Sequence, residues 1–139
     1  MNLKQRIEDS MTGDRIFTAV ILSGIVFGGL SAYIGSLLFL APTQFFESVV
    51  LAKIFFTSFN IIILSALTYT YFSIYREVPT SMSRGLTMFS AALLLYALTS
   101  SPLLHIYTGF DTITVGPFTY VPDMFVSIAA SVIFYESQK

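Results

Sequence analysis

The chain has 139 residues, of which 55% are hydrophobic and 11% charged, and it contains no cysteine. Soluble domains carry about 25% charged residues, so a chain this poor in charge is expected to be surrounded by lipid rather than water. The net charge of −1 gives no reason to expect nucleic acid as a partner, and the lack of cysteine excludes disulfides, iron–sulfur ligation and thiol chemistry.

The chain begins with a polar segment that carries one narrow apolar stripe. Leu3, Ile7 and Met11 recur at every fourth position, which predicts a short amphipathic helix ahead of Ile16. Such an N-terminal arm has two interpretations. It lies at the lipid headgroups, or it docks a partner subunit, and both stay open at the level of sequence.

Four apolar stretches follow, each long enough for a membrane-spanning helix of about 20 residues. We expect these helices at about 16–40, 49–75, 86–106 and 118–135. The chain is therefore predicted to be all-α. It should form an integral membrane four-helix bundle with a short N-terminal amphipathic arm, in a single transmembrane domain over 1–139.

Basic residues gather on one side of the predicted crossings. They stand before the first helix, between the second and third helices, and at the C-terminus: Lys4, Arg6, Arg15, Arg76, Arg84 and Lys139. Cytoplasmic loops of membrane proteins carry an excess of Lys and Arg. We therefore expect a multi-pass protein of the cell membrane with both termini in the cytoplasm.

A row of small residues lies on one face of the first predicted helix. Gly24, Gly28, Ala32 and Gly35 are spaced by four, four and three positions. Because lipid offers no hydrophobic driving force between helices, small residues promote association by letting backbones approach closely. This face predicts helix packing, and the sequence leaves open whether the neighbouring helix belongs to this chain or to another protein.

The second predicted helix carries a polar seam, and the fourth carries one acid. The seam consists of Lys53, Thr57, Asn60, Thr68, Tyr71 and Tyr75, which fall on one side of the helix. Asp123 follows Pro122 near the start of the fourth helix, with Ser127 on the same face. Ionisable groups inside a bilayer are costly and usually paired, so we expect an ion pair between Lys53 and Asp123. It would lock two helices together; the alternatives are a Lys53 that extends to the interface alone, or a proton or ion relay.

No catalytic, cofactor-binding or metal-binding set is expected. His105 is the only histidine, and with Asp111 it supplies two ligands where a metal site needs three or four. Ser100 and His105 lie in one segment without a third group to orient the base, so a catalytic triad is not expected either.

The second half of the chain, 69–135, resembles a family of small, uncharacterised archaeal membrane proteins. The segments that carry the resemblance are Arg84–Leu86, Leu94–Tyr96, Ser101–His105, Tyr120–Phe125 and Ile133–Tyr135. Proteins of this kind occur in ammonia-oxidising archaea, where small helical subunits accompany the copper monooxygenase of the membrane. The resemblance implies an accessory role, with archaeal ammonia monooxygenase as the named complex, and it implies no active-site residue in this chain.

The preferred function is accordingly a non-catalytic accessory or structural subunit of a larger membrane complex, such as a membrane oxidoreductase. The expected partners are the lipid bilayer and other membrane subunits, with no nucleic acid and no cofactor. The alternative is a small homo-oligomeric transporter or channel that uses Lys53, Asn60 and Asp123. A membrane enzyme is the least favoured reading, because one histidine and no cysteine offer little chemistry.

Overall fold

The computed structural model describes residues 2–38, 44–101 and 120–138. The described residues form four helices: α1 (Leu3–Leu38), α2 (Gln44–Glu77), α3 (Ser81–Thr99) and α5 (Val121–Ser137). The expectation of an all-α helical bundle is confirmed. The sequence-based bounds for residues 39–43 and 102–119, including the predicted end of the third helix and the start of the fourth, lie outside the described residues.

The N-terminal arm is part of α1 and not a separate element. Its residues form the first turns of a helix that continues for 36 residues to Leu38. No proline interrupts this stretch, and Gly13, in an interior position, is tolerated. The apolar stripe of the arm therefore belongs to the same continuous helix as the first predicted membrane span.

The third helix begins five residues earlier than the hydropathy suggested, because a capping box starts it at Ser81. The Thr80 hydroxyl accepts a hydrogen bond from the Ser83 amide at 3.1 Å, and the Ser83 hydroxyl accepts one from the Thr80 amide at 3.0 Å. These two bonds satisfy amide groups that a helix start leaves unpaired. The α-helix ends at Thr99, shortly before Pro102, which disfavours helical geometry in the residue ahead of it.

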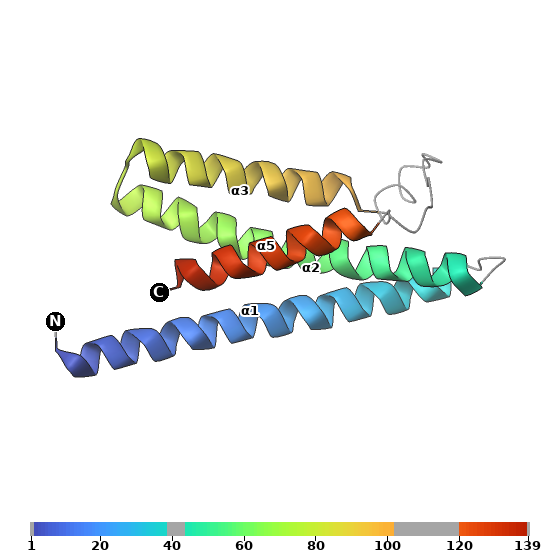
Figure 1. The fold of residues 1–139 in the computed structure, drawn as a ribbon, viewed down its shortest axis with the longest axis horizontal. Coiled ribbons are helices and arrows are strands. Elements are labelled where there is room, and N and C mark those ends of the chain that lie inside the picture. Colours follow the sequence, from blue (N-terminus) through green and yellow to red (C-terminus); the bar gives the residue numbers. More distant parts are fainter. Residues whose placement is uncertain (1, 39–43, 102–119, 139) are drawn as a thin grey trace.

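Helix α2 is the centre of the bundle. It packs against α1 on one side, α3 on another and α5 on a third, while contacts between α1 and α5 are sparser. Figure 1 shows α1 and α3 running in one direction and α2 and α5 in the other. The buried apolar core lies where α2 meets α3 and α5, and consists of Ile63, Leu64, Leu67, Ala97, Ala130 and Phe134.

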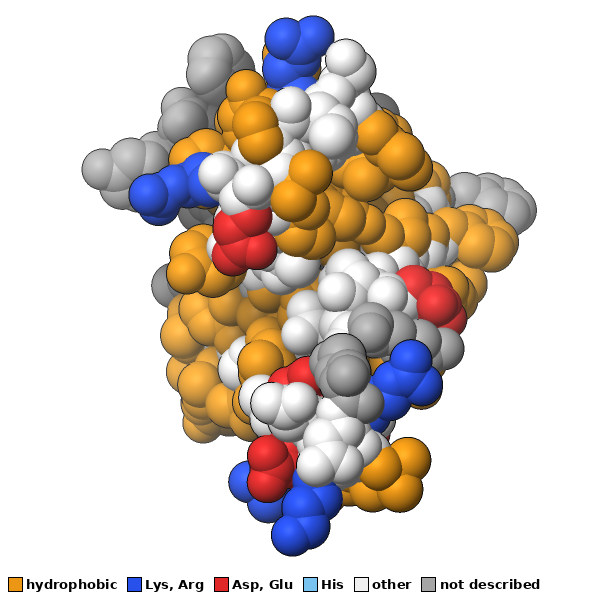
Figure 2. Space-filling view, turned by 90° about the vertical axis from the view of Figure 1, so that its left-hand side faces the viewer, with side chains coloured by type: hydrophobic (Ala, Val, Ile, Leu, Met, Phe, Trp, Pro, Cys, Tyr) orange, Lys and Arg blue, Asp and Glu red, His pale blue; other side chains and the backbone are white. Residues whose placement is uncertain are grey.

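Both termini lie at the same end of the molecule, together with the turn between α2 and α3 (Figure 1). Figure 2 looks onto this end and shows Lys, Arg, Asp and Glu side chains around its rim. The exposed charged residues include Lys4 and Arg6 on α1 and Arg76 and Arg84 beside the α2–α3 turn. These four basic residues thus lie at the end of the bundle that holds both termini.

Three of the described helices, α1, α2 and α3, are long and apolar enough to cross a membrane. Large apolar side chains such as Leu22 and Leu30 on α1 and Leu95 on α3 are more than half exposed. In a protein that spans a bilayer, lipid chains cover such side chains. With 17 described residues, α5 is shorter than the other three helices.

Candidate functional site

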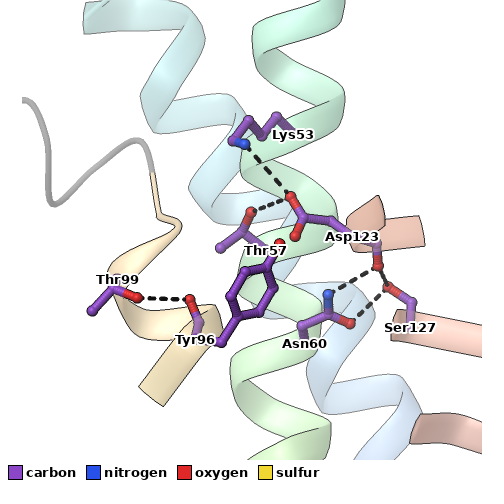
Figure 3. A network of polar contacts seen from close by, with 7 residues as sticks. All are labelled: Lys53, Thr57, Asn60, Tyr96, Thr99, Asp123 and Ser127. Carbon is purple, nitrogen blue, oxygen red and sulfur yellow. Dashed lines mark hydrogen bonds and ion pairs between the residues drawn. The ribbon is translucent and has the colours of Figure 1, made fainter. Parts of the chain in front are cut away.

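The structure brings Lys53 of α2 and Asp123 of α5 together inside the bundle. The Lys53 Nζ lies 3.8 Å from Asp123 Oδ2. Asp123 is only 1% exposed, whereas the Lys53 side chain is 22% exposed. The Thr57 hydroxyl, one turn after Lys53, donates a hydrogen bond of 3.3 Å to the same carboxylate oxygen (Figure 3). The carboxylate is thus held from α2 by one cation and one hydroxyl.

The start of α5 positions this acid. Pro122 stands in the first turn, where its missing amide hydrogen costs nothing, and Asp123 follows it. A negative charge in the first turn is favoured by the partial positive charge of the helix N-terminus. Asp123 therefore combines a favourable place on its own helix with an opposite charge on α2.

A second set of hydrogen bonds ties the next turn of α5 to α2. Asn60 donates its Nδ2 hydrogen to the main-chain oxygen of Asp123 at 2.9 Å. The Ser127 hydroxyl lies 2.7 Å from Asn60 Oδ1 and 2.8 Å from the Asp123 main-chain oxygen. Asn60 is 1% exposed, so both ends of its amide are satisfied away from solvent. We call Lys53, Thr57, Asn60, Asp123 and Ser127 the polar cluster; Figure 3 shows how its members face one another.

The chemistry of the polar cluster is that of a neutralised ion pair with its own hydrogen-bond network. A carboxylate and an ammonium of opposite charge cancel at short range, which makes their burial between helices tolerable. Among the described residues no group of three His, Cys, Asp or Glu side chains lies close enough together to hold a metal ion. The arrangement holds α5 on α2, and the partly exposed Lys53 connects it to the surface.

The small-residue face of α1 contacts α2. A Cβ atom added at Gly28 would lie 3.0 Å from the main-chain oxygen of Phe55, and one added at Gly24 would lie 2.9 Å from the Phe59 ring. At Gly35 the nearest atom would be Cδ1 of Ile54, at 2.6 Å. The neighbour that sequence left open is therefore internal. Ala32 is only partly buried, and Ser31 takes the buried place between Gly28 and Gly35.

The remaining residues of the polar seam lie away from the cluster. Thr68 has a buried hydroxyl oxygen with no hydrogen-bond partner among the described residues. Tyr71 packs against the apolar core, and Tyr75 is half-buried near the end of α2. The seam thus divides into a cluster around Asp123 and separate positions toward the α2–α3 turn.

The residues weighed for catalysis and metal binding have no joint site in the described part of the chain. His105 and Asp111 lie outside the described residues. Ser100 caps the end of α3, where its main-chain amide donates to the Tyr96 oxygen at 2.8 Å. Its place at the end of α3 is explained by helix termination.

Sequence reasoning missed one small residue of the α1–α2 contact and the direction of one aromatic ring. Ser31 completes a spacing of four, three and four with Gly24, Gly28 and Gly35, which a search for all small residues would have found. Tyr96 of α3 points its ring toward the polar cluster in Figure 3, although it comes from a third helix. No pattern along the sequence links Tyr96 to Asp123.

The chain matches a known protein family. Residues 49–138, more than half of the chain, match the model of a family described as a family of unknown function (DUF8036). No curated protein and no solved structure matches the chain. The matched range holds all five residues of the polar cluster and leaves α1 outside. The chain therefore belongs to the DUF8036 family.

Proposed function

We propose that this protein is a non-catalytic accessory subunit of a larger membrane complex, docked to its partner through the start of α1. The observation that carries the proposal is the exposed apolar stripe of that segment. Leu3 is 74% exposed, and Ile7 and Met11 are each 53% exposed. Residues 2–12 are all exposed, so no part of this chain described by the structure covers the stripe.

The geometry of α1 argues against an arm lying flat on the bilayer. A helix of 36 residues is about 54 Å long at about 1.5 Å per residue, whereas the hydrocarbon core is about 30 Å thick. Gly13 lies against the main chain of Gln138, at the end of α5, and the earlier turns extend past that point (Figure 1). A continuous helix carries the stripe away from the membrane, where an apolar surface on a partner protein covers it best.

The polar cluster supports a structural role. Its hydrogen bonds and its ion pair join α2 to α5, so the polar groups of the cluster serve a helix–helix contact. The named candidate for the complex, an archaeal membrane oxidoreductase such as ammonia monooxygenase, rests on the resemblance of residues 69–135 alone. The partner class is a membrane protein with an apolar groove or helix beside its cytoplasmic surface.

Co-migration tests the subunit proposal. The wild-type chain, extracted from its native membrane in mild detergent, should migrate with other membrane proteins. Ile7→Asp together with Met11→Asp should abolish that co-migration while leaving the melting temperature of the isolated protein unchanged, because both positions are exposed. Thr12→Asp, an exposed change outside the stripe, is the matched control and should have no effect. A wild-type chain that migrates alone or only with copies of itself would overturn the proposal.

We also infer a multi-pass protein of the cell membrane with four crossings and both termini in the cytoplasm. The shared position of the termini and the basic residues at that end support this orientation. Because the chain lacks cysteine, single cysteines can report it. Cysteines at Ser10 and Ser137 should resist an impermeant thiol reagent in intact cells, and one at Thr108 should react. Labelling of position 137 from outside would contradict the even number of crossings.

One observation favours a second function, a small homo-oligomeric transporter or channel. The three residues that a transport pathway would use, Lys53, Asn60 and Asp123, lie in one cluster. Intramembrane ionisable residues mark ion or proton pathways in many transporters. Ion or proton flux in proteoliposomes tests this candidate. A flux that Lys53→Met abolishes in a folded protein would favour transport over the subunit role.

A further inference from the structure

The polar cluster has one unfilled hydrogen-bonding position. Both described contacts to the Asp123 carboxylate, from Lys53 at 3.8 Å and from Thr57 at 3.3 Å, go to Oδ2. Asp123 Oδ1 is buried and has no hydrogen-bond partner among the described residues. A buried charged oxygen without a donor is costly, and native structures usually supply the donor from protein or from an ordered molecule.

The charge of the surroundings selects the class of that molecule. A carboxylate oxygen only accepts hydrogen bonds, so the occupant must present an O–H or N–H group or be a cation. The Lys53 ammonium already balances the charge of Asp123. A second cation on Oδ1 would lie close to that ammonium in a medium of low dielectric, where like charges repel strongly. A neutral donor meets the need without that repulsion.

The exposure of the polar cluster and the side chains around Asp123 Oδ1 favour a small bound molecule. Lys53 is partly exposed, so the cluster reaches the surface at one end, while Thr57, Asn60 and Asp123 are buried. Figure 3 shows the Tyr96 ring directed from α3 toward the same carboxylate. Its phenolic hydroxyl can both donate and accept, which is what a bound water or small solute needs from a second partner.

We propose that Asp123 Oδ1 binds one small neutral hydrogen-bond donor, of the size of water or of a short alcohol or amide, between α2, α3 and α5. The site is independent of whether the chain acts as a subunit or as a transporter. Its ligand chemistry is a neutral O–H or N–H group, supplied either by an internal water or by a small solute.

An experimental structure of the full chain in lipid nanodiscs tests the occupancy. At a resolution that shows ordered waters, density that is not protein should lie within hydrogen-bonding distance of Asp123 Oδ1. This readout needs no variant. A donor from the chain itself on Oδ1, including one from residues 102–119, would overturn the proposal, as would a carboxylate that touches only carbon atoms.

Ligand titrations test whether the occupant is a neutral donor or a cation. They also distinguish an internal water from a small solute. The melting temperature should not change in a saturable way when sodium chloride replaces choline chloride at equal ionic strength. A saturable rise with sodium that Asp123→Asn removes would show a cation site and overturn the proposal. A saturable shift with methanol or formamide, lost in Asp123→Asn and kept in the exposed control Asp9→Asn, identifies a solute as the source. If neither solute shifts it, and the density of the previous experiment is present, water is the source.

Discussion

The central helix α2 holds its two neighbours α1 and α5 by different means. Against α1 it presents Phe55 and Phe59, and glycines on α1 let the two helices come close. Against α5 it presents Lys53, Thr57 and Asn60, which bind the start of α5 through charge and hydrogen bonds. Contacts that depend on shape and contacts that depend on polarity are thus found on one helix, within two turns of each other.

The two interfaces should respond differently to substitution. The α1–α2 contact loses close packing when a side chain is added, but it leaves no charge unpaired. At the α2–α5 contact, removing one charge leaves its partner unpaired in a medium of low dielectric. Substitutions should therefore produce different patterns of stability loss at the two interfaces.

Breaking the ion pair from its Lys53 side should have the largest effect. Lys53→Met leaves Asp123, which is 1% exposed, without its counter-charge. We expect the free energy of unfolding in mixed micelles to fall by about 3 kcal/mol. Asp123→Asn should cost less, because the partly exposed Lys53 can extend to the interface.

The double variant separates coupling from independent losses. Lys53→Met with Asp123→Asn should cost less than the two single changes together, because no charge is left unpaired. Ser65→Ala, on an exposed position whose hydroxyl bonds only to its own helix, is the control and should change little. Strictly additive losses would mean that Lys53 and Asp123 do not interact.

Adding a Cβ atom at Gly28 should cause the next largest loss of stability. Gly28→Ala places a Cβ atom 3.0 Å from the main-chain oxygen of Phe55, which cannot rotate away. We expect a loss of about 2 kcal/mol from overpacking, measured by the same unfolding experiment. Gly29→Ala is the matched control, since no atom of the described residues lies within 4 Å of the added atom. The idea that α1 is held by close approach fails if the two alanine variants are equally stable.

Gly24→Ala should cost less than Gly28→Ala. Its added Cβ atom would meet the ring of Phe59 at 2.9 Å, and a ring can tilt where a main chain cannot. We expect about 1 kcal/mol. A loss larger than that of Gly28→Ala would show that the Phe59 ring is fixed by its stacking on Phe55, whose centroid lies 6.4 Å away.

The smallest expected effect belongs to Ser127→Ala. This change removes the hydroxyl that bonds to Asn60 Oδ1 at 2.7 Å. Hydrogen bonds between membrane helices contribute about 0.6 kcal/mol on average, and we expect a loss of that size. Ser131→Ala removes a hydroxyl that bonds only within α5, and it should have no measurable effect. Equal losses in the two variants would remove Ser127 from the α2–α5 contact.

Sequence patterns were most informative for properties that depend on a single helix, such as its position in the chain and its packing face. Hydropathy places α1 and α2, and the glycine spacing on α1 marks its packing face, because both depend on periodicity along one helix. The helix ends were less predictable: α3 starts at Ser81 because Thr80 and Ser83 form a capping box with serine in place of the usual Glu or Gln. Hydropathy is insensitive to such polar bonds.

The amino-acid sequence is enough to predict that the chain is helical, that lipid surrounds it, and that Lys53 and Asp123 each need a partner. These conclusions follow from composition, periodicity and the cost of burying a charge, which are properties of single segments. Three other facts come from the packing of the helices: α2 is central, its Lys53 reaches Asp123, and Asp123 Oδ1 has no donor among the described residues. Those facts depend on how helices that are distant in sequence pack in space, and the helix period carries no information about which neighbour a face will meet.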